Sequence, residues 1–180
     1  MKQNLGPEHG ALTLHTGRAG AASKAGHDLT LLVGAWTGSA TTDEAGALTH
    51  LRLVADVGSL QVVRGDGGLK PLTDKDRGTI VEHAFATMKQ AQHPEVIFET
   101  DSVQLDQGSG RLTGHVTIAG VTRPLTVEVT HSRDGETTRA QATAAITQTE
   151  FGIKPYSGML GALRVRDLVE VRCAITVPHS

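Results

Sequence analysis

Along most of this chain, apolar and polar residues alternate in short runs separated by clusters of Gly, Asp and Ser. The clearest run places apolar side chains at every second position, namely Leu51, Leu53, Ala55 and Val57. A period of two is what a β-strand with one buried face and one solvated face produces. The pattern therefore predicts an all-β protein with frequent turns.

The alternation predicts eight strands. They cover residues 11–16, 29–36, 51–57, 96–105, 111–119, 121–131, 137–149 and 168–177. Turn-forming residues are found at 43–46, 65–68, 106–110 and 133–135, and Gly120 predicts a tight corner. Because most connections join strands that are neighbours in sequence, we expect an eight-stranded antiparallel up-and-down barrel.

One segment, Thr73–Gln90, breaks the alternation and predicts a single inserted α-helix. Thr73 is a suitable N-cap, and Asp74 and Asp76 place negative charge in the first turn. Apolar residues follow at helical spacing: Ile80, Ala84, Phe85 and Met88. The helix should end before Pro94, because the residue preceding a proline disfavours helical geometry. We expect this helix to cover one end of the barrel, with Phe85 and Met88 as an adaptable lid.

Length and charge narrow the classes of function. A chain of 180 residues is expected to fold as one domain, residues 1–180. The formal net charge of −2 leaves no basic excess for a phosphate backbone, so nucleic acid is not an expected partner. The sequence shows neither an apolar run of about 18 residues nor an export signal. We therefore expect a cytoplasmic protein without an integral membrane segment.

The composition bears on whether the barrel is hollow. At about eight strands, the interior can be filled by side chains or can hold one small ligand. Aromatic residues make up only 3% of the chain, and 21 residues are glycine. Fewer bulky side chains leave less volume to plug the interior, which favours a cavity. Alternation alone does not separate the two cases, so a filled barrel remains an alternative.

The sequence gives little support for a catalytic site or a metal site. Gly17–Lys24 lacks the spacing of a phosphate-binding loop, and Ser157 lacks the leading glycine of a nucleophile elbow. The single cysteine, Cys173, alternates with Val171 and Ile175 and should point inward as an inert thiol. A metal site would need histidines from several strands to converge: His15, His27, His50, His115 or His131. We expect no catalytic residue, no metal and no cofactor.

Five short motifs, in order, resemble those of one known family. Residues 114–125 read G-H-V-T-I-A-G-V-T-R-P-L, and residues 93–100 read H-P-E-V-I-F-E-T. Shorter matches lie at 56–60 (D-V-G-S-L), 149–153 (T-E-F-G-I) and 165–171 (V-R-D-L-V-E-V). Together they make the chain similar to YceI-like proteins over about residues 10 to 177. Two departures are His93, where the family has tyrosine, and Val116, where it has leucine.

This resemblance implies a lipocalin-like antiparallel barrel that binds a polyisoprenoid or similar amphiphile in an apolar pore, commonly as a dimer. No cofactor-driven chemistry is generally attributed to the family. We accordingly expect a binder or carrier of an apolar ligand, such as an isoprenoid lipid or isoprenoid quinone, and not an enzyme. The predicted ligand-binding residues are His27, Leu29, Leu31, Phe85, Met88, Phe98, Ile118, Phe151 and Tyr156.

Three of the polar residues, His27, Arg123 and Tyr156, are predicted to orient a ligand head group near the mouth of the pore. Two alternatives stay open. One is a structural or interaction module with a filled interior. The other is a barrel enzyme that uses cavity histidines, such as His27 or His115, as acid and base groups.

Overall fold

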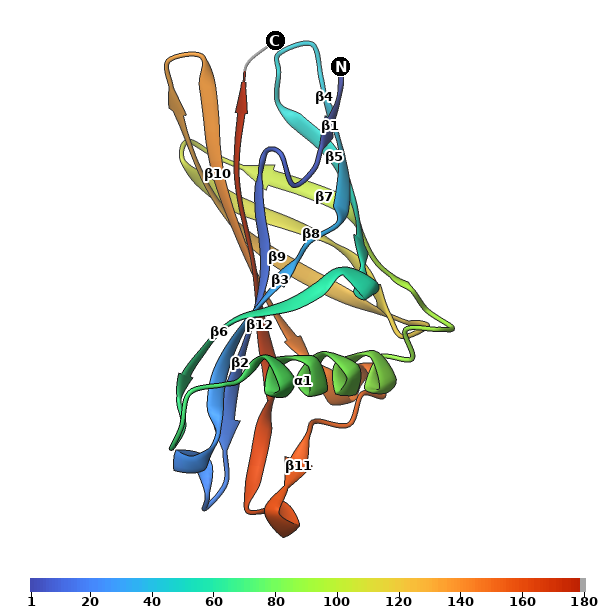
Figure 1. The fold of residues 1–180 in the computed structure, drawn as a ribbon. Helices are drawn as coiled ribbons and strands as arrows, with labels where there is room; N and C mark the ends of the chain where they lie inside the picture. The colour runs from blue at the N-terminus through green and yellow to red at the C-terminus, as the bar shows by residue number, and fades with distance from the viewer. Residues whose placement is uncertain (179–180) are drawn as a thin grey trace.

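The computed structural model describes residues 1–178 and is dominated by strands (Figure 1). The strands are β1 (Lys2–Leu5), β2 (Gly10–Ala19), β3 (His27–Val33), β4 (Trp36–Thr42), β5 (Leu48–Asp56), β6 (Leu60–Gly67), β7 (Glu95–Leu105), β8 (Ser109–Ile118), β9 (Val121–Asp134), β10 (Thr137–Thr147), β11 (Ser157–Gly158) and β12 (Leu163–Pro178). One α-helix, α1 (Asp74–Thr87), separates β6 from β7. Four short 3-10 helices are η1 (Ser23–Ala25), η2 (Val57–Ser59), η3 (Gln148–Phe151) and η4 (Met159–Gly161).

All strands belong to one antiparallel sheet of twelve, in the order β1-β4-β5-β7-β8-β9-β10-β12-β2-β3-β6, with β11 paired to β12. The predicted count of eight strands is therefore wrong. The sheet is a curled half-barrel, because the strand pairing of the described residues ends at β1 and β6 and does not join these two edges. The all-β class, the antiparallel pairing and the single inserted helix are confirmed.

A bent hairpin connects the two ends of the curled sheet. Strand β3 leads into β4 across Gly34-Ala35, and β5 leads into β6 through η2, while β3 pairs with β6 and β4 with β5. At the bend, the backbone N–H of Asp56 donates to the carbonyl of Ala35 at 3.0 Å, and that of Gly34 donates to Ser59 at 3.1 Å. One half of the hairpin pairs with β2 and the other with β7. This corner allows the sheet to surround an interior space.

Inward-facing side chains form two buried clusters that share partly buried neighbours. The first covers β7 to β10 and contains Phe98, Leu112, Val116 and Ile118. The second covers β2 to β6 and contains Leu12, Leu31, Val33 and Trp36. Alternating burial along β8 and β9 confirms the predicted two-residue period of these strands.

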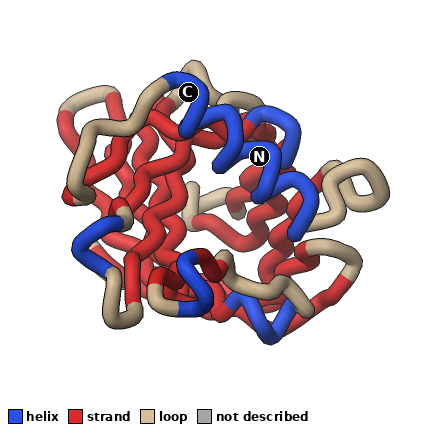
Figure 2. Tube along the Cα trace, turned by 60° about the horizontal axis from the view of Figure 1, so that its bottom comes forward, coloured by secondary structure: helices blue, strands red, loops and turns tan. Residues whose placement is uncertain are grey.

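Helix α1 forms as the sequence predicts and carries a complete capping box. The Thr73 hydroxyl accepts from the Asp76 backbone N–H at 3.2 Å, and the Asp76 carboxylate accepts from the Thr73 backbone N–H at 2.8 Å. The Thr73 hydroxyl also donates to the Asp76 carboxylate at 2.7 Å. This hydrogen bond, followed by the one from the Thr73 backbone N–H, lowers the pKa of Asp76. The helix has no buried residue, and Figure 2 shows it lying along one side of the ring of strands.

Among residues 1–178, no helix has the length and apolar character needed to cross a membrane.

Candidate functional site

The curled sheet and α1 enclose one large cavity with a volume of about 1320 Å³. Its wall consists mainly of inward-facing apolar side chains from β2 to β5, β7 to β10 and β12, and α1 contributes Ile80, Ala84 and Met88. Lining residues come from β1 and the β4–β5 hairpin at the upper end in Figure 1, and from the segments before α1 and before β11 at the lower end. The cavity therefore runs between the two ends and offers an elongated, mostly apolar space.

Small side chains explain why the interior is hollow. Strand β10 turns Ala140, Ala142 and Ala144 toward the cavity, and β4 contributes Gly38 and Ala40. A strand with leucine or phenylalanine at these positions would fill the space at the packing density normal for protein interiors. The cavity thus agrees with the hollow interior that the low content of bulky side chains favours.

Seven of the nine residues predicted to bind ligand line the cavity. They are His27, Leu29, Leu31, Met88, Phe98, Ile118 and Tyr156. Their contact with a ligand remains a prediction.

The other two, Phe85 and Phe151, do not line the cavity. Phe151 is only 3% exposed and packs in the cluster of β7 to β10, because η3 interrupts strand periodicity there. Phe85 packs against the cluster of β2 to β6 and borders a shallow depression beside Lys89. Of the two residues predicted to act as a lid, only Met88 lines the cavity, and the lid role itself stays a prediction.

The three residues predicted to orient a ligand head group do not all lie together in the structure. His27 lies at the lower end of the cavity, where its Nε2 is 2.8 Å from the Lys70 carbonyl oxygen. Tyr156 also lines this end and packs edge-on against the ring of His83, with a distance of 5.1 Å between ring centroids. Arg123 does not line the cavity, and its Nε donates to the Glu150 carbonyl oxygen at 3.2 Å.

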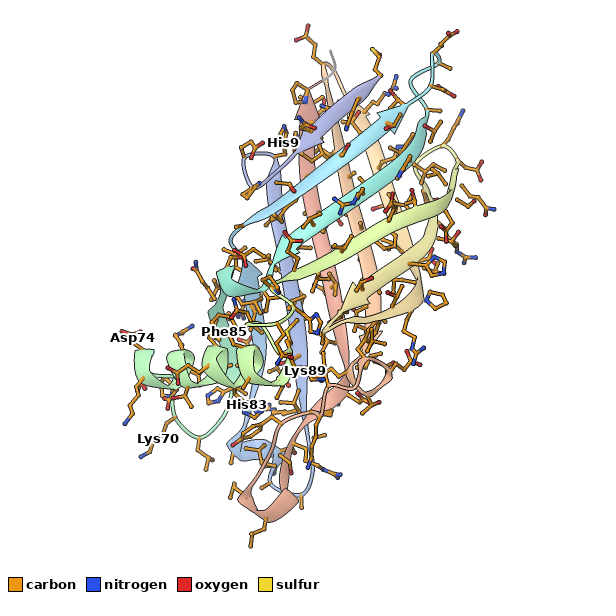
Figure 3. The ribbon with its side chains drawn as sticks, turned by 90° about the vertical axis from the view of Figure 1, so that its right-hand side faces the viewer. His9, Lys70, Asp74, His83, Phe85 and Lys89 are labelled. Atoms are coloured by element: carbon orange, nitrogen blue, oxygen red, sulfur yellow. The ribbon has the colours of Figure 1, made fainter. Side chains whose placement is uncertain are left out.

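The lower end of the cavity also contains five polar residues that the sequence analysis did not predict. Lys70, Lys75, His83, Lys154 and Arg164 all contribute to its lining. Lys70 comes from the loop before α1, Lys75 and His83 from α1 itself, and the last two from the segments on either side of β11. Figure 3 labels Lys70 and His83 beside the helix. The available signal was the Leu69-Lys70-Pro71-Leu72 sequence directly before the predicted N-cap.

The histidines proposed for acid and base chemistry do not converge. His115 lies outside the cavity with its Nδ1 2.6 Å from Asp101 Oδ2, and the Nε2 of His50 lies 3.2 Å from Glu99 Oε1. Burial, followed by the charge of Arg172, lowers the pKa of His15, which also lies outside the cavity. Among residues 1–178, no group of three or more His, Cys, Asp or Glu side chains is placed to hold a metal ion.

Cys173 lines the cavity from β12, as its alternation with Val171 and Ile175 predicted. Burial raises the pKa of its thiol to about 11. The neutral thiol therefore predominates at physiological pH, and Cys173 contributes another apolar group to the wall.

A model of the YceI-like domain matches residues 6–177. BcnA of Burkholderia cenocepacia has a similar structure, with a TM-score of 0.65 and 16% sequence identity over 92% of this chain and 96% of BcnA. A YCEI protein of Campylobacter jejuni is also similar, with a TM-score of 0.60 and 14% identity over 81% of each chain. No curated protein matches the chain. Because the matched domain spans nearly all of the sequence, the chain belongs to the YceI-like family.

Proposed function

We propose that this protein binds and carries an extended apolar molecule, such as a polyisoprenoid, an isoprenoid quinone or a similar amphiphile, in the cavity. The observation that carries the proposal is the cavity itself, which has a volume of about 1320 Å³ and a mostly apolar wall. Such a space needs no directional chemistry to hold its ligand, because each methylene group moved out of water contributes about 0.8 kcal/mol.

The geometry favours binding over catalysis. The cavity histidines, His27 and His83, lie at the lower end, where His27 approaches a backbone carbonyl and His83 packs on Tyr156. Neither approaches a side-chain carboxylate within ion-pair distance in the described structure, whereas the pairs that do so lie elsewhere. The polar groups at this end are suited to orienting the head of an amphiphile whose chain lies along the apolar wall.

Extraction of the purified protein with organic solvent, followed by mass spectrometry, tests the proposal directly. We expect a co-purifying lipid with a long hydrocarbon chain. A matching titration uses isoprenols of increasing length, and the affinity should rise with length until the cavity is filled. A protein that is empty after purification and binds no isoprenol of any length would refute the proposal.

A matched pair of substitutions on β10 separates the cavity from the rest of the surface. Ala142 lines the cavity, whereas Ala145 is exposed. Ala142→Phe should plug the middle of the cavity and shorten the longest isoprenol that binds. Ala145→Phe adds the same side chain outside and should leave the length profile unchanged. Identical profiles for both variants would show that the ligand does not occupy the cavity.

A further inference from the structure

The lower end of the molecule exposes several large apolar side chains. Leu160 is fully exposed, Leu69 is 79% exposed and Met159 is 61% exposed. Met159 and Leu160 lie in η4, the lowest part of the ribbon in Figure 1, and Leu69 lies in the loop before α1, higher in that view. Single exposed apolar residues are common, but two adjacent large ones on one turn, such as Met159 and Leu160, indicate a surface that contacts something apolar.

The backbone of η4 presents these side chains in an unusual conformation. Met159 and Leu160 have φ values of 51° and 55°, a region that bulky residues rarely adopt. Hydrogen bonds fix the turn at its base, where the Ala162 N–H donates to the Met159 carbonyl at 3.1 Å and the Ala22 N–H donates to the Ala162 carbonyl at 2.8 Å. Residues 159–161 are called the apolar tip below. Hydrogen bonds within η4 and from the segment before η1 hold this tip in place.

Positive charge surrounds this tip. Residues 154–166 carry three basic residues, Lys154, Arg164 and Arg166, and no acidic residue. Lys24 of η1 and Lys70 are also exposed at this end, and neither forms an ion pair within the described structure. The upper end differs, because its two hairpin segments, 42–48 and 133–137, together contain four acidic residues and one arginine. The protein as a whole has a net charge of −2, so the basic excess of residues 154–166 is a local feature of the lower end.

We propose that the lower end docks on an anionic lipid bilayer. Leu160, Met159 and Leu69 would enter the interfacial region while the surrounding lysines and arginines contact lipid phosphates, a combination that holds peripheral proteins on membranes. The surface is continuous with the cavity opening, where Lys70 and Lys154 line the cavity. Docking itself does not depend on the ligand. Its use, which is transfer of a lipid between bilayer and cavity without passage through water, rests on the function proposed above.

Vesicle flotation of the purified full-length protein tests the docking. One set of vesicles contains phosphatidylcholine alone, and a second contains phosphatidylcholine mixed with phosphatidylglycerol. We expect the protein to float with the anionic vesicles only, and added salt should weaken the association because exposed charges are screened. Absence of binding to anionic vesicles, or equal binding to both kinds, would overturn the proposal.

Two substitutions that avoid the cavity sharpen this test. Leu160→Ser should weaken vesicle binding about tenfold through lost apolar contact, and Lys24→Ala should weaken it about fivefold through lost charge. The matched controls are Leu168→Ser, at a leucine that is 54% exposed further along β12, and Lys89→Ala, just beyond the C-terminal end of α1. These controls should bind as the unmodified protein does. If controls and tip variants behave alike, the tip is not the docking surface.

The same variants keep docking separate from ligand binding. Neither Leu160 nor Lys24 lines the cavity, so both variants should retain the co-extracted ligand. A fluorophore attached at Leu160→Cys gives a second readout, and it should shift its emission to the blue on anionic vesicles if the tip enters the bilayer. An unchanged emission would overturn the proposal. A change only when protein concentration rises would also overturn it and would assign the tip to contact with a second protein copy.

Discussion

The cavity has two very different sides, the curled sheet and helix α1. The sheet presents deeply buried residues, such as Val116 and Leu112 at 3% and 4% exposure, and each central strand is hydrogen-bonded on both edges. Helix α1 has no buried residue and lies beside the strands, held partly by a 2.7 Å hydrogen bond from Arg77 to the Val62 carbonyl. In Figure 3 its Asp74 end projects away from the strands, whereas Lys89 lies near them.

This difference indicates that the sheet and α1 have different roles in ligand binding. An element with many buried contacts opens only with the whole fold, whereas one with few buried contacts opens locally at a much smaller free-energy cost. The sheet should therefore determine the shape of the cavity, and α1 should determine how quickly a ligand enters and leaves. A carrier needs both properties, since a rigid pocket without a mobile side would trap its ligand.

The largest expected difference between the sheet side and α1 is in stability. Substitution of one phenylalanine on each side measures it. Phe151→Ala should lower the free energy of unfolding by about 3–5 kcal/mol, because it leaves a hole in a packed cluster. Phe85→Ala, on the half-buried face of α1, should cost only about 1 kcal/mol, because roughly half of a side-chain transfer free energy is lost. Urea unfolding measures both. Equal losses would show that α1 is as firmly integrated as the sheet.

Cys173 reports on the sheet side of the cavity through its reactivity. Burial raises the pKa of its thiol from 9.0 to about 11. Well below pH 9, the thiolate is therefore about 100-fold scarcer than in an unburied cysteine, and alkylation by iodoacetamide should be slowed by about that factor. The rate should rise with pH toward 11, and a bound isoprenol should lower it further. Alkylation as fast as that of free cysteine, with or without ligand, would show an open wall.

The sheet was predictable where alternation is uninterrupted. Strands β7, β8 and β9 were predicted within a few residues, as were the N-cap at Thr73 and the corner at Gly120, whose φ is 79°. Three of the four strands that were not predicted, β4, β6 and β11, contain glycine. Residues 65–68 predict a turn, yet Gly65 and Gly67 belong to β6 and pair with β3. Pairing with a neighbouring strand stabilises extended glycines, and no local pattern reveals that neighbour.

The sequence predicted which residues line the cavity better on strands than elsewhere. A period of two assigns Leu29, Leu31 and Phe98 to the interior because side chains on a strand alternate strictly between faces. That rule does not apply to η3 or α1, where Phe151 and Phe85 turn away from the cavity. The basic residues at the lower end were missed because they converge from three separate segments, and only the three-dimensional fold brings these together.

The smallest expected effect concerns the helix cap and access to the cavity. Thr73→Ala removes the hydroxyl that accepts from the Asp76 backbone N–H, and loss of such a cap typically destabilises a helix enough to shift a local equilibrium about fivefold. We expect release of a fluorescent isoprenoid analogue to become about fivefold faster, while the urea midpoint hardly changes. Thr143→Ala, at an exposed position on β10, is the matched control and should alter neither quantity.

The same cap should make the rate of ligand release depend on pH. Its hydrogen bonds lower the pKa of Asp76, so the cap is fully formed above the usual pKa of an aspartate and is lost as the pH falls through the lowered value. Ligand release should therefore accelerate in acid in the unmodified protein. Thr73→Ala should remove most of this acceleration, because the hydroxyl that makes the largest contribution to the lowered pKa of Asp76 is gone. An unchanged pH profile in the variant would show that opening of α1 does not control release.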